Sequence, residues 1–577
     1  MKVLGISAYF HDAAAALVID GEVVAAAQEE RFSRLKNDAR LPKDAIRFCL
    51  RQAGLRLDEL DHVVFYEKPL RKFERILLTH LREFPRSAPQ FGRALGKWLT
   101  KRLWLKSELC AELGCTPEQL LFVDHHLSHA ASAFLCSPHE HAAVLTVDGV
   151  GEHSSTTIYD ARGNDLEPLE EIRFPDSIGL LYSAITAYLG FRVNHGEYKV
   201  MGLAPYGEPR FVEQFEQLCH IGDDGSFRLD PQYFAYARSA NRSFTPRLEA
   251  LLGPARRSDD PIELPRSQRF ADVAASLQLV TERALLALAR RAKDRTGADA
   301  LCLAGGVALN SVANRKIVDS GIFEHVFVQP AAGDAGGALG AALYVDHAIG
   351  GTPRRGAMRS ALLGESYDPK QIRSFLADCR VRHEHFVDRR ELDRTVAKRL
   401  ASGEVGGWFQ GRFEWGPRAL GARSILADAR QAHMADRVNA KIKFREAFRP
   451  FAPAVRASEA SRWFDVGRDA SLTRFMLSVA PVTPEGRATL PATTHVDGSA
   501  RVQTVDAESS PRLASLLDAF AEETGVGVLL NTSMNLKNEP LCASPAEAYG
   551  VFQRSALDFL VLEDCVITKR ASRKDAS

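Results

Sequence analysis

Two histidines near the start of an alanine-rich stretch, residues 124–134, have a spacing that suits metal binding. His125 and His129 are four residues apart, and they follow an apolar run at 120–123 that predicts a buried strand. If 124–134 forms a helix, both imidazoles lie on one of its faces. Neutral imidazole is a common ligand of iron, zinc and related metals. Two ligands do not complete a site, so carboxylates must come from elsewhere in the chain.

Two aspartates are the best candidates for these carboxylates. Asp148 follows the apolar run 143–147 and precedes Gly149, and Asp334 follows Gly333 at the start of an alanine-rich segment. Both are predicted at strand-end or helix-start turns, where open α/β sheets bind their ligands. The alternative is that the histidines only cap or pack a helix. The two glycine-flanked aspartates favour a mixed nitrogen and oxygen metal site.

A second group of residues, in the C-terminal third, suits phosphate. Basic side chains lie there beside Gly, Pro and small hydroxyl residues, and not along a helix face. Arginine forms forked hydrogen bonds with phosphate, and lysine supplies a mobile point charge. The alternative is a set of surface arginines paired with acids, which their turn positions disfavour. The group comprises Arg418, Lys443, Arg445, Arg449 and Arg501, with Ser533 and Asn535 after the apolar run 526–530.

The elements that would position these residues predict an α/β protein. Strands are expected at 3–7, 13–18 and 22–27, with a hairpin turn at Asp20-Gly21. A similar strand–turn–strand plan recurs at 143–147 and 154–159. This duplication is the pattern of the actin and sugar-kinase (ASKHA) superfamily, in which two lobes enclose a nucleotide or phosphate cleft. Glycine-rich segments at 304–310 and 333–340 would let backbone approach such a ligand.

The remaining segments complete a two-domain plan. Residues 40–120 are predicted to be mostly helical and basic; we interpret 65–120 as a helical insertion with solvated faces, and the alternative is an acceptor or nucleic-acid surface. A long amphipathic helix is expected at 265–295. The segment 350–356 is typical of a linker. We therefore expect a first domain at 1–350, a linker at 351–365 and a second domain at 366–577.

Composition narrows the classes of function. The 577 residues carry 74 Lys and Arg against 73 Asp and Glu, a net charge of +1, which argues against bulk nucleic-acid binding. Nine cysteines without a C-x-x-C pair predict a reducing cytoplasm and no zinc ribbon. No run approaches the roughly 20 apolar residues that span a membrane. We expect a cytoplasmic protein with no membrane partner.

Eight motifs in one order resemble those of the NodU/CmcH family of O-carbamoyltransferases, nearly end to end. They lie at residues 10–13, 29–34, 124–131, 199–207, 304–310, 415–424, 445–453 and 531–535. The resemblance implies a YrdC-like C-terminal domain that makes carbamoyl adenylate and pyrophosphate from carbamoyl phosphate and ATP with Mg²⁺. It implies an ASKHA-type N-terminal domain that passes the carbamoyl group to a hydroxyl of a small-molecule acceptor, a natural product or sugar, and releases AMP. A homodimer would fit this family.

The resemblance also assigns roles to residues by position. His125, His129, Asp148 and Asp334 match metal ligands, with Fe²⁺ the expected ion. His11 matches a transfer-site histidine that accepts or orients the acceptor's hydroxyl proton, and Lys36 is expected to contact phosphate nearby. The adenylation-site matches are Arg418, Lys443, Arg449, Arg501, Ser533 and Asn535; the residues expected to hold the adenylate in the N-terminal domain are Gly305, Gly306, Asn310 and Gly336.

Three other functions fit this sequence less well. A tRNA threonylcarbamoyl-transfer enzyme is the main alternative, and the balanced charge and the second polar centre count against it. A hydrogenase-maturation carbamoyltransferase would carry zinc-finger cysteine pairs, which this sequence lacks. A non-catalytic metal- or nucleotide-binding regulator would not need two complete polar centres.

Overall fold

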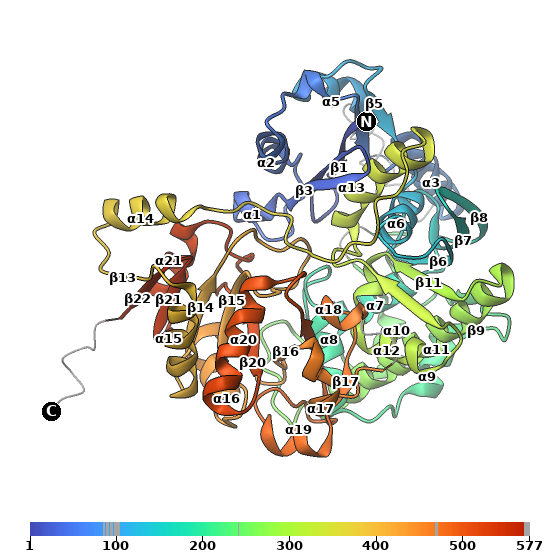
Figure 1. The fold of residues 1–577 in the computed structure, drawn as a ribbon. Helices are drawn as coiled ribbons and strands as arrows, with labels where there is room; N and C mark the ends of the chain where they lie inside the picture. The colour runs from blue at the N-terminus through green and yellow to red at the C-terminus, as the bar shows by residue number, and fades with distance from the viewer. Residues whose placement is uncertain are drawn as a thin grey trace. The chain divides into compact units, whose positions relative to one another are not determined.

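The computed structural model describes residues 1–84, 87, 92, 96, 104–239, 242–467 and 471–569, and these form two compact units. The first unit comprises Met1–Glu29 and Asn37–Met358, and the second comprises Glu30–Lys36 and Arg359–Ser577. Glu30–Lys36 therefore interrupts the first unit in sequence but belongs to the second. Figure 1 labels the elements of both units. Part of the predicted helical insertion at 65–120 lies outside the described residues.

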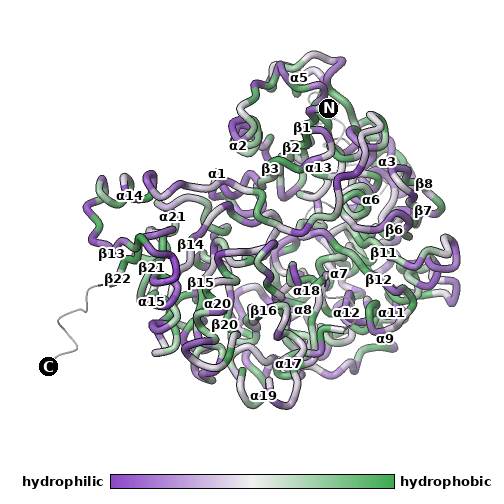
Figure 2. Tube along the Cα trace, viewed as in Figure 1, coloured by the Kyte–Doolittle hydropathy of each residue, from purple (hydrophilic) through white to green (hydrophobic). Residues whose placement is uncertain are grey.

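The first sheet of unit 1 has the order β3-β2-β1-β4-β5. Strands β1 (Lys2–Ser7), β2 (Ala14–Ile19) and β3 (Glu22–Gln28) pair antiparallel, as the sequence predicted. Asp20 and Gly21 both have positive φ, 48° and 82°, which is the backbone of a two-residue hairpin. Val3, Leu4 and Ile6 are buried, and the tube in Figure 2 shows the hydrophobic character of such core segments.

The second sheet of unit 1 repeats this plan. Its order is β8-β7-β6-β11-β12, so an antiparallel meander of three strands is again followed by two parallel ones. The strands are β6 (His141–Val147), β7 (Ser154–Arg162), β8 (Asp165–Arg173), β11 (Ala300–Ala304) and β12 (His325–Val328). The duplication predicted from the sequence is confirmed, and two such lobes are the architecture of the actin and sugar-kinase superfamily.

The described residues of 40–120 are mostly helical, as predicted, but the prediction left out one strand. The described residues include the helices α2 (Lys43–Ala53), α3 (Pro69–Arg82) and α5 (Leu105–Leu113), but also a parallel strand, β4 (His62–Phe65), which pairs with β1 and with β5 (Leu120–Phe122). Four residues are too few to show a strand period inside a mostly helical stretch. The strand conformation of β4 is instead stabilised by its parallel pairing with β1 and β5, which are distant in the sequence.

Two small-residue helices lie close together in unit 1, and both carry predicted metal ligands. They are α6 (His125–Phe134) and α13 (Asp334–Leu343), and they pack against each other. A Cβ atom on Gly340 would lie 1.8 Å from the carbonyl oxygen of Ser128, so only glycine allows this approach. The alanines of α6 and the alanines and glycines of α13 therefore let the two helices approach closely, which brings the N-terminus of α13 towards the histidines of α6.

Unit 2 is built on an eight-stranded mixed sheet with helices on both faces. Its order is β13-β22-β21-β14-β15-β20-β16-β19. Side chains alternate between two cores. Trp408 and Leu426 pack with α15 (Arg389–Ala401) and α20 (Pro511–Thr524), whereas Phe409 and Ile425 pack with α14 (Pro369–Asp378) and α21 (Pro545–Arg554). The strands are β13 (Glu384–His385), β14 (Gly406–Phe409), β15 (Arg423–Asp428), β16 (Ala452–Arg456), β19 (Gln503–Val505), β20 (Val528–Ser533), β21 (Phe559–Leu562) and β22 (Cys565–Thr568).

The remaining elements are short apart from one long helix. That helix is α11 (Gln268–Thr296), which confirms the amphipathic helix predicted at 265–295. The others in unit 1 are α7 (Ile178–Tyr188), α8 (Glu197–Leu203), α9 (Val212–Leu218), α10 (Pro246–Leu252), α12 (Ser311–Asp319), β9 (Cys219–Ile221) and β10 (Phe227–Leu229). Those in unit 2 are α1 (Glu30–Ser33), α14 (Pro369–Asp378), α15 (Arg389–Ala401), α16 (Met434–Val438), α17 (Ala460–Trp463), α18 (Ser471–Arg474), α19 (Pro484–Thr489), α20 (Pro511–Thr524), α21 (Pro545–Arg554), β17 (Ala480–Pro481) and β18 (Ser499–Ala500).

Among the helices of the described residues, none combines the length and the apolar character needed to span a bilayer. All nine cysteines lie in the described part of the chain and all are free thiols.

Candidate functional site

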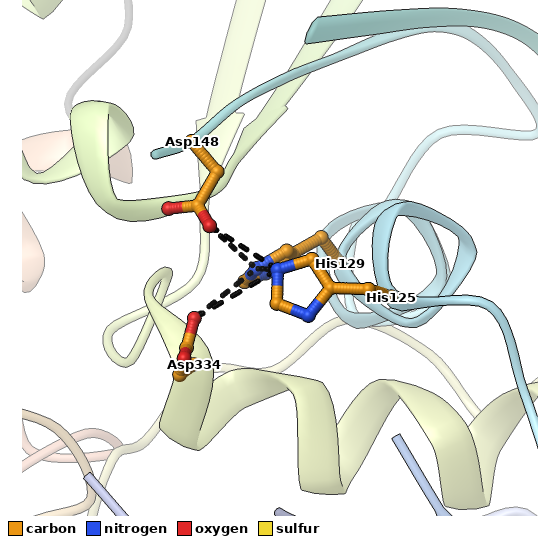
Figure 3. Close-up of side chains that lie close together, drawn as sticks. All are labelled: His125, His129, Asp148 and Asp334. Atoms are coloured by element: carbon orange, nitrogen blue, oxygen red, sulfur yellow. Dashed lines mark hydrogen bonds and ion pairs between the residues drawn. The ribbon is translucent and has the colours of Figure 1, made fainter. Parts of the chain in front are cut away.

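Four buried side chains in unit 1 converge on one point. His125, His129, Asp148 and Asp334 each offer a ligand atom, and these atoms all lie within 4.8 Å of one another. The Nε2 atoms of the two histidines are 3.1 Å apart, and Asp148 Oδ2 is 3.1 Å from His125 Nε2. Asp334 Oδ1 lies 3.7 Å from His129 Nε2 (Figure 3). The sequence placed these four residues together, and the structure does the same.

Two of the three histidines of helix α6 point into this centre. His125 and His129 are one turn apart and share a face. His126 points elsewhere: its Nε2 donates to the carbonyl oxygen of Ser154 at 2.8 Å, and its Nδ1 lies 2.6 Å from Thr146 Oγ1. Burial, together with the two neighbouring imidazoles, lowers the pKa of His126 to about 3. This histidine is therefore neutral and ties α6 to β6 and to the start of β7.

Asp148 is placed by the end of strand β6. Its Oδ1 accepts a hydrogen bond from the backbone N–H of Gly306 at 2.8 Å, which leaves Oδ2 for the histidines. Gly305 has φ of 90°, and a Cβ atom there would lie 2.3 Å from the carbonyl oxygen of Val147. Only glycine adopts this backbone so near a neighbouring strand. Gly305 and Gly306 thus adjoin the centre, as expected of residues near a bound adenylate, although that contact stays a prediction.

Asp334 is the first residue of α13 and is fully buried. Among the described residues, neither of its carboxylate oxygens has a hydrogen-bond donor. A buried carboxylate without such a partner is costly unless a cation neutralises it. Two imidazole nitrogens and two carboxylates form a donor set that suits Fe²⁺ or Zn²⁺. The residues therefore fit a metal ion, which they would hold through His125, His129, Asp148 and Asp334.

The charges at this centre also fit a cation. Burial would lower the pKa of His125, but its hydrogen bond to Asp148 and the charge of Asp334 outweigh burial and raise that pKa to about 9. Burial alone would raise the pKa of Asp148, but the two histidines hold it well below its ordinary value. Without a metal, protons balance the carboxylates. A metal cation would displace those protons, since it needs neutral imidazole and ionised carboxylate.

His11 lies beside the same carboxylates. Its Nε2 is 3.7 Å from Asp334 Oδ2, and its Nδ1 is 3.1 Å from Asp12 Oδ2. Burial lowers its pKa, but Asp334 and Asp12 outweigh burial and raise it to about 10. A protonated ring donates hydrogen bonds, and it would orient an anionic or hydroxyl oxygen. The side chain keeps 22% of its surface exposed, so a substrate can reach it.

Glu152 is a residue of this site that the sequence did not single out, although it follows Gly151 in the turn after Asp148. Its carboxylate accepts the backbone N–H of Lys68 at 2.7 Å and that of His125 at 3.0 Å. One buried group thus joins the turn after β4, the first turn of α6 and the turn after β6. Burial raises the pKa of Glu152, which shows that its ionised form is poorly solvated.

We expect Glu152→Gln to weaken metal binding by about tenfold, in line with the effect of outer-shell partners at metal sites. Glutamine keeps one acceptor oxygen but places an amide donor near the His125 N–H, so α6 shifts. Equilibrium titration with Fe²⁺ or Co²⁺ measures the effect. Glu249→Gln is a matched control, because Glu249 accepts the backbone N–H of Ala255 elsewhere in unit 1. Equal affinity in both variants would contradict a positioning role for Glu152.

The second polar centre lies in unit 2 around Lys443. This residue ends a π-helical turn, Asn439–Lys443, a type of turn that is frequent at functional sites. Its Nζ donates to Ser533 O at 2.8 Å, to Asn535 O at 3.0 Å and also to the Asn535 side chain. The predicted strand at 526–530 is β20, which begins at Val528 and continues through Ser533. Ser533 therefore lies at the end of the strand itself.

Cations dominate the surroundings of Lys443. Burial, with the nearby charges of Arg445 and Arg449, holds its pKa well below the ordinary value. Arg501 is similar: burial and the charges of Arg418, Arg445 and Arg449 hold its pKa well below normal. The Nε of Arg501 is buried and has no hydrogen-bond partner among the described residues. We call Arg418, Lys443, Arg445, Arg449 and Arg501 the cation cluster. It has the character of a polyanion site.

This electrostatic arrangement predicts proton uptake when an anion binds. The pKa of Lys443 is lowered in the free protein, so at about pH 8 more of it is neutral than of an ordinary lysine, and a bound anion raises that pKa again. Binding of ATP, already deprotonated at that pH, should therefore take a proton from the buffer. Calorimetry in two buffers of different ionisation enthalpy measures this uptake. Lys443→Arg, which cannot lose its charge, should remove it; unchanged uptake would contradict the assignment.

The other predicted site residues are placed as follows. The Asn310 side chain accepts the N–H of Ala313 at the start of α12 and pairs with Gln278, which is a structural use of its amide. Gly336 lies in the first turn of α13, close to Gln329. Lys36 belongs to unit 2, where its charge contributes to the lowered pKa of Lys443. Adenylate or phosphate contacts for these residues stay predictions.

Comparison with known proteins assigns this chain to a protein family. A model described as the carbamoyltransferase N-terminus matches residues 2–343, and one described as the carbamoyltransferase C-terminus matches 397–569. The nodulation protein NolNO of Sinorhizobium fredii is 39% identical over 99% of this chain and 81% of its own length. A 3'-hydroxymethylcephem-O-carbamoyltransferase of Streptomyces clavuligerus is 36% identical over 41% of this chain and 43% of its own.

Two further matches differ widely in their sequence identity to this chain. An uncharacterized protein of Synechocystis sp. is 47% identical over 99% of this chain and 97% of its own length. A solved structure of HypF from T. kodakarensis covers 61% of this chain and 48% of its own at 17% identity, with a TM-score of 0.32, too distant to carry an argument. The two family models together span both units. The chain therefore belongs to the carbamoyltransferase family, the NodU/CmcH family that its motifs resemble.

Proposed function

We propose that this carbamoyltransferase divides its reaction between its two units. In unit 2, water cleaves carbamoyl phosphate to carbamate and inorganic phosphate, and the carbamate oxygen then attacks the α-phosphorus of ATP, held with Mg²⁺, to give carbamoyl adenylate and pyrophosphate. In unit 1, the carbamoyl group passes to a hydroxyl of a small-molecule acceptor, and AMP is released. The observation that carries this proposal is the cation cluster, where Lys443 and Arg501 are buried among other cations with their pKa values held well below normal.

Unit 2 is suited to the activation step because its cations oppose the charges of two phosphorylated substrates. Ordered cations in a site that excludes water stabilise charge on a phosphoryl group more than water does. Lys443 is held by backbone and side-chain acceptors of Ser533 and Asn535, so its position is fixed before substrate binds. A fixed cation costs little reorganisation when the phosphoryl charge develops.

Unit 1 is suited to the transfer step because the metal centre and His11 lie side by side. We propose Fe²⁺ as the ion held by His125, His129, Asp148 and Asp334; when bound, it would supply Lewis-acid stabilisation of phosphate. His11 would orient the acceptor's hydroxyl, with Asp12 fixing its ring through Nδ1 at 3.1 Å. Asn37 donates to the other oxygen of Asp12 at 2.6 Å and so holds that carboxylate in place.

Pyrophosphate release without an acceptor tests the activation step. The full chain, loaded with Fe²⁺, is incubated with ATP, Mg²⁺ and carbamoyl phosphate. Release that needs both substrates supports the proposal. Absence of release in folded, metal-loaded protein, with or without candidate acceptors, would overturn it. A parallel incubation with tRNA, threonine and bicarbonate tests the alternative threonylcarbamoyl transfer.

The acceptor is a hydroxylated small molecule in this proposal. One relative is named for a 3'-hydroxymethylcephem substrate and another for nodulation, so a screen should include a hydroxymethylcephem and hydroxylated oligosaccharides. Formation of AMP above the acceptor-free rate identifies an acceptor. The bulk net charge of +1 gives no support to a nucleic-acid acceptor.

We expect His11→Asn to reduce acceptor-dependent AMP formation by at least about 100-fold, the usual effect of losing a positioned hydrogen-bond donor at a reacting oxygen. Pyrophosphate release and metal content should stay within about twofold of the parent protein, since asparagine fits the space and Asp334 is unchanged. His141→Asn is the control, because His141 on β6 pairs with Asp160 on the neighbouring strand β7. Unchanged AMP formation in His11→Asn would remove His11 from the transfer step.

A further inference from the structure

The segment Glu30–Lys36 is far from unit 2 in sequence but is a part of it. The chain leaves the first sheet after β3, forms the single turn of α1 and returns to unit 1 at Asn37. Figure 1 draws α1 in the blue of the N-terminus. Every contact described below lies within unit 2.

Arg31 connects this segment to the loop that carries Arg418. Its side chain is only 2% exposed, and Nη2 donates to the carbonyl oxygen of Gly416 at 2.7 Å. Gly416 is two residues before Arg418. The ring of Phe32 meets that of Phe413 edge-on, with centroids 6.0 Å apart, in the same loop. A residue of the loop itself also stabilises its conformation. Glu414 Oε1 accepts hydrogen bonds from the backbone N–H groups of Leu420, Ala422 and Arg423.

Arg34 connects the segment to a second loop, which carries Asn535. Its Nη1 donates to Leu541 O at 2.7 Å and its Nη2 to Pro540 O at 2.9 Å. A carboxylate oxygen of Glu547 lies 3.2 Å from Nη1. The backbone of Arg34 is left-handed, with φ of 60°, which is a strained conformation for a residue other than glycine. The contacts of its side chain hold the residue in this conformation.

The second loop leads directly to Lys443. Asn535 Nδ2 donates to Glu539 O at 2.7 Å, which closes the loop next to the carbonyls that Arg34 holds. Asn535 O in turn accepts from Lys443 Nζ at 3.0 Å. Arg31 therefore binds the loop that carries Arg418, and Arg34 binds the loop that carries Asn535, an acceptor of Lys443.

We propose that Glu30–Lys36 is a positioning element of the cation cluster, in which Arg31 holds the loop of Arg418 and Arg34 holds the loop of Asn535. The proposal rests on the proposed polyanion site and names a part of that site outside the C-terminal sequence. Lys36, at the end of the segment, adds a further positive charge near Lys443. A consequence is that residues 359–577 alone would lack a part of their own site.

The test is Arg34→Met in the full chain, with inorganic pyrophosphate as the probe. Arg34 is 28% exposed, so methionine keeps most of the packing and removes only the donors. We expect the dissociation constant for pyrophosphate to rise about tenfold, the scale of losing charged hydrogen bonds. In turnover, KM for ATP should rise more than kcat falls. Arg34→Lys, which can still donate to a carbonyl, should recover part of the affinity.

Arg354→Met is the matched control. Arg354 also holds backbone carbonyls, those of Phe134 and His139, but does so in unit 1. It should leave pyrophosphate affinity unchanged. An affinity loss in Arg34→Met alone supports the proposal, and parent-like affinity in Arg34→Met overturns it.

Hydrogen exchange separates this proposal from the proposed function. In Arg34→Met, amides of 535–541 should exchange faster than in the parent, while those of α6 should not. If the parent protein fails to bind pyrophosphate, the polyanion function is wrong, and the exchange result still decides whether Arg34 positions its loop. Unchanged exchange at 535–541 would overturn the positioning role whether or not pyrophosphate binds.

Discussion

Lys443→Met should abolish acceptor-independent pyrophosphate release, with a fall of at least about 100-fold, because loss of one pre-positioned donor at a transition-state charge costs roughly that much. Methionine approximates the length of the lysine side chain and fills the same buried space. It removes the ammonium that donates to Ser533 O at 2.8 Å and to Asn535 O at 3.0 Å. The carbonyls of both residues would lose a fixed donor, so the loop carrying them would also relax.

Lys441→Met is the control for this variant. Lys441 lies on the same π-helical turn two residues earlier, but it is exposed whereas Lys443 is buried. It should release pyrophosphate at the parent rate. Measured side by side with initial rates at saturating ATP and carbamoyl phosphate, the pair separates a role of the buried charge from an effect on the turn. Comparable rates in both variants would exclude Lys443 from the activation step.

The two centres differ in how far the sequence predicts them. The metal centre is predictable because its signals are local: two histidines at helical spacing, and two aspartates beside glycines at the ends of strands or the starts of helices. The structure brings these four residues within 4.8 Å of one another. The hairpin strands at the start of each lobe follow from the same logic, since hairpin turns and apolar runs repeat in the sequence.

What the sequence does not predict depends on contacts with backbone at long range. Glu152 caps the N–H groups of Lys68 and His125, and any residue could supply those N–H groups, so no pattern of side chains marks the contact. Arg31 and Arg34 likewise bind carbonyl oxygens about 385 and 507 residues away along the chain. Strand β4 was missed for a related reason, because its partners β1 and β5 define it more than its own four residues do.

Asp334→Asn should remove the metal and, with it, carbamoyl transfer. The carboxylate is buried, has no hydrogen-bond donor among the described residues, and lies 3.7 Å from both His129 Nε2 and His11 Nε2. Asparagine has the same shape but no charge, and its amide would point a donor or a weaker acceptor at the ion. We expect metal content below about one tenth of the parent value, consistent with loss of an anionic ligand from a buried site.

Two readouts make this prediction specific. Metal analysis of the purified protein reports the ligand role directly, and acceptor-dependent AMP formation should fall at least about 100-fold, as expected when charge stabilisation by a metal is lost. Pyrophosphate release should persist, because the cation cluster belongs to the other unit. Asp299→Asn serves as control, since Asp299 is a surface carboxylate paired with Lys293. Full metal content in Asp334→Asn would remove Asp334 from the ligand set, whereas loss of both activities together would indicate that the metal centre supports the whole fold and not the transfer step alone.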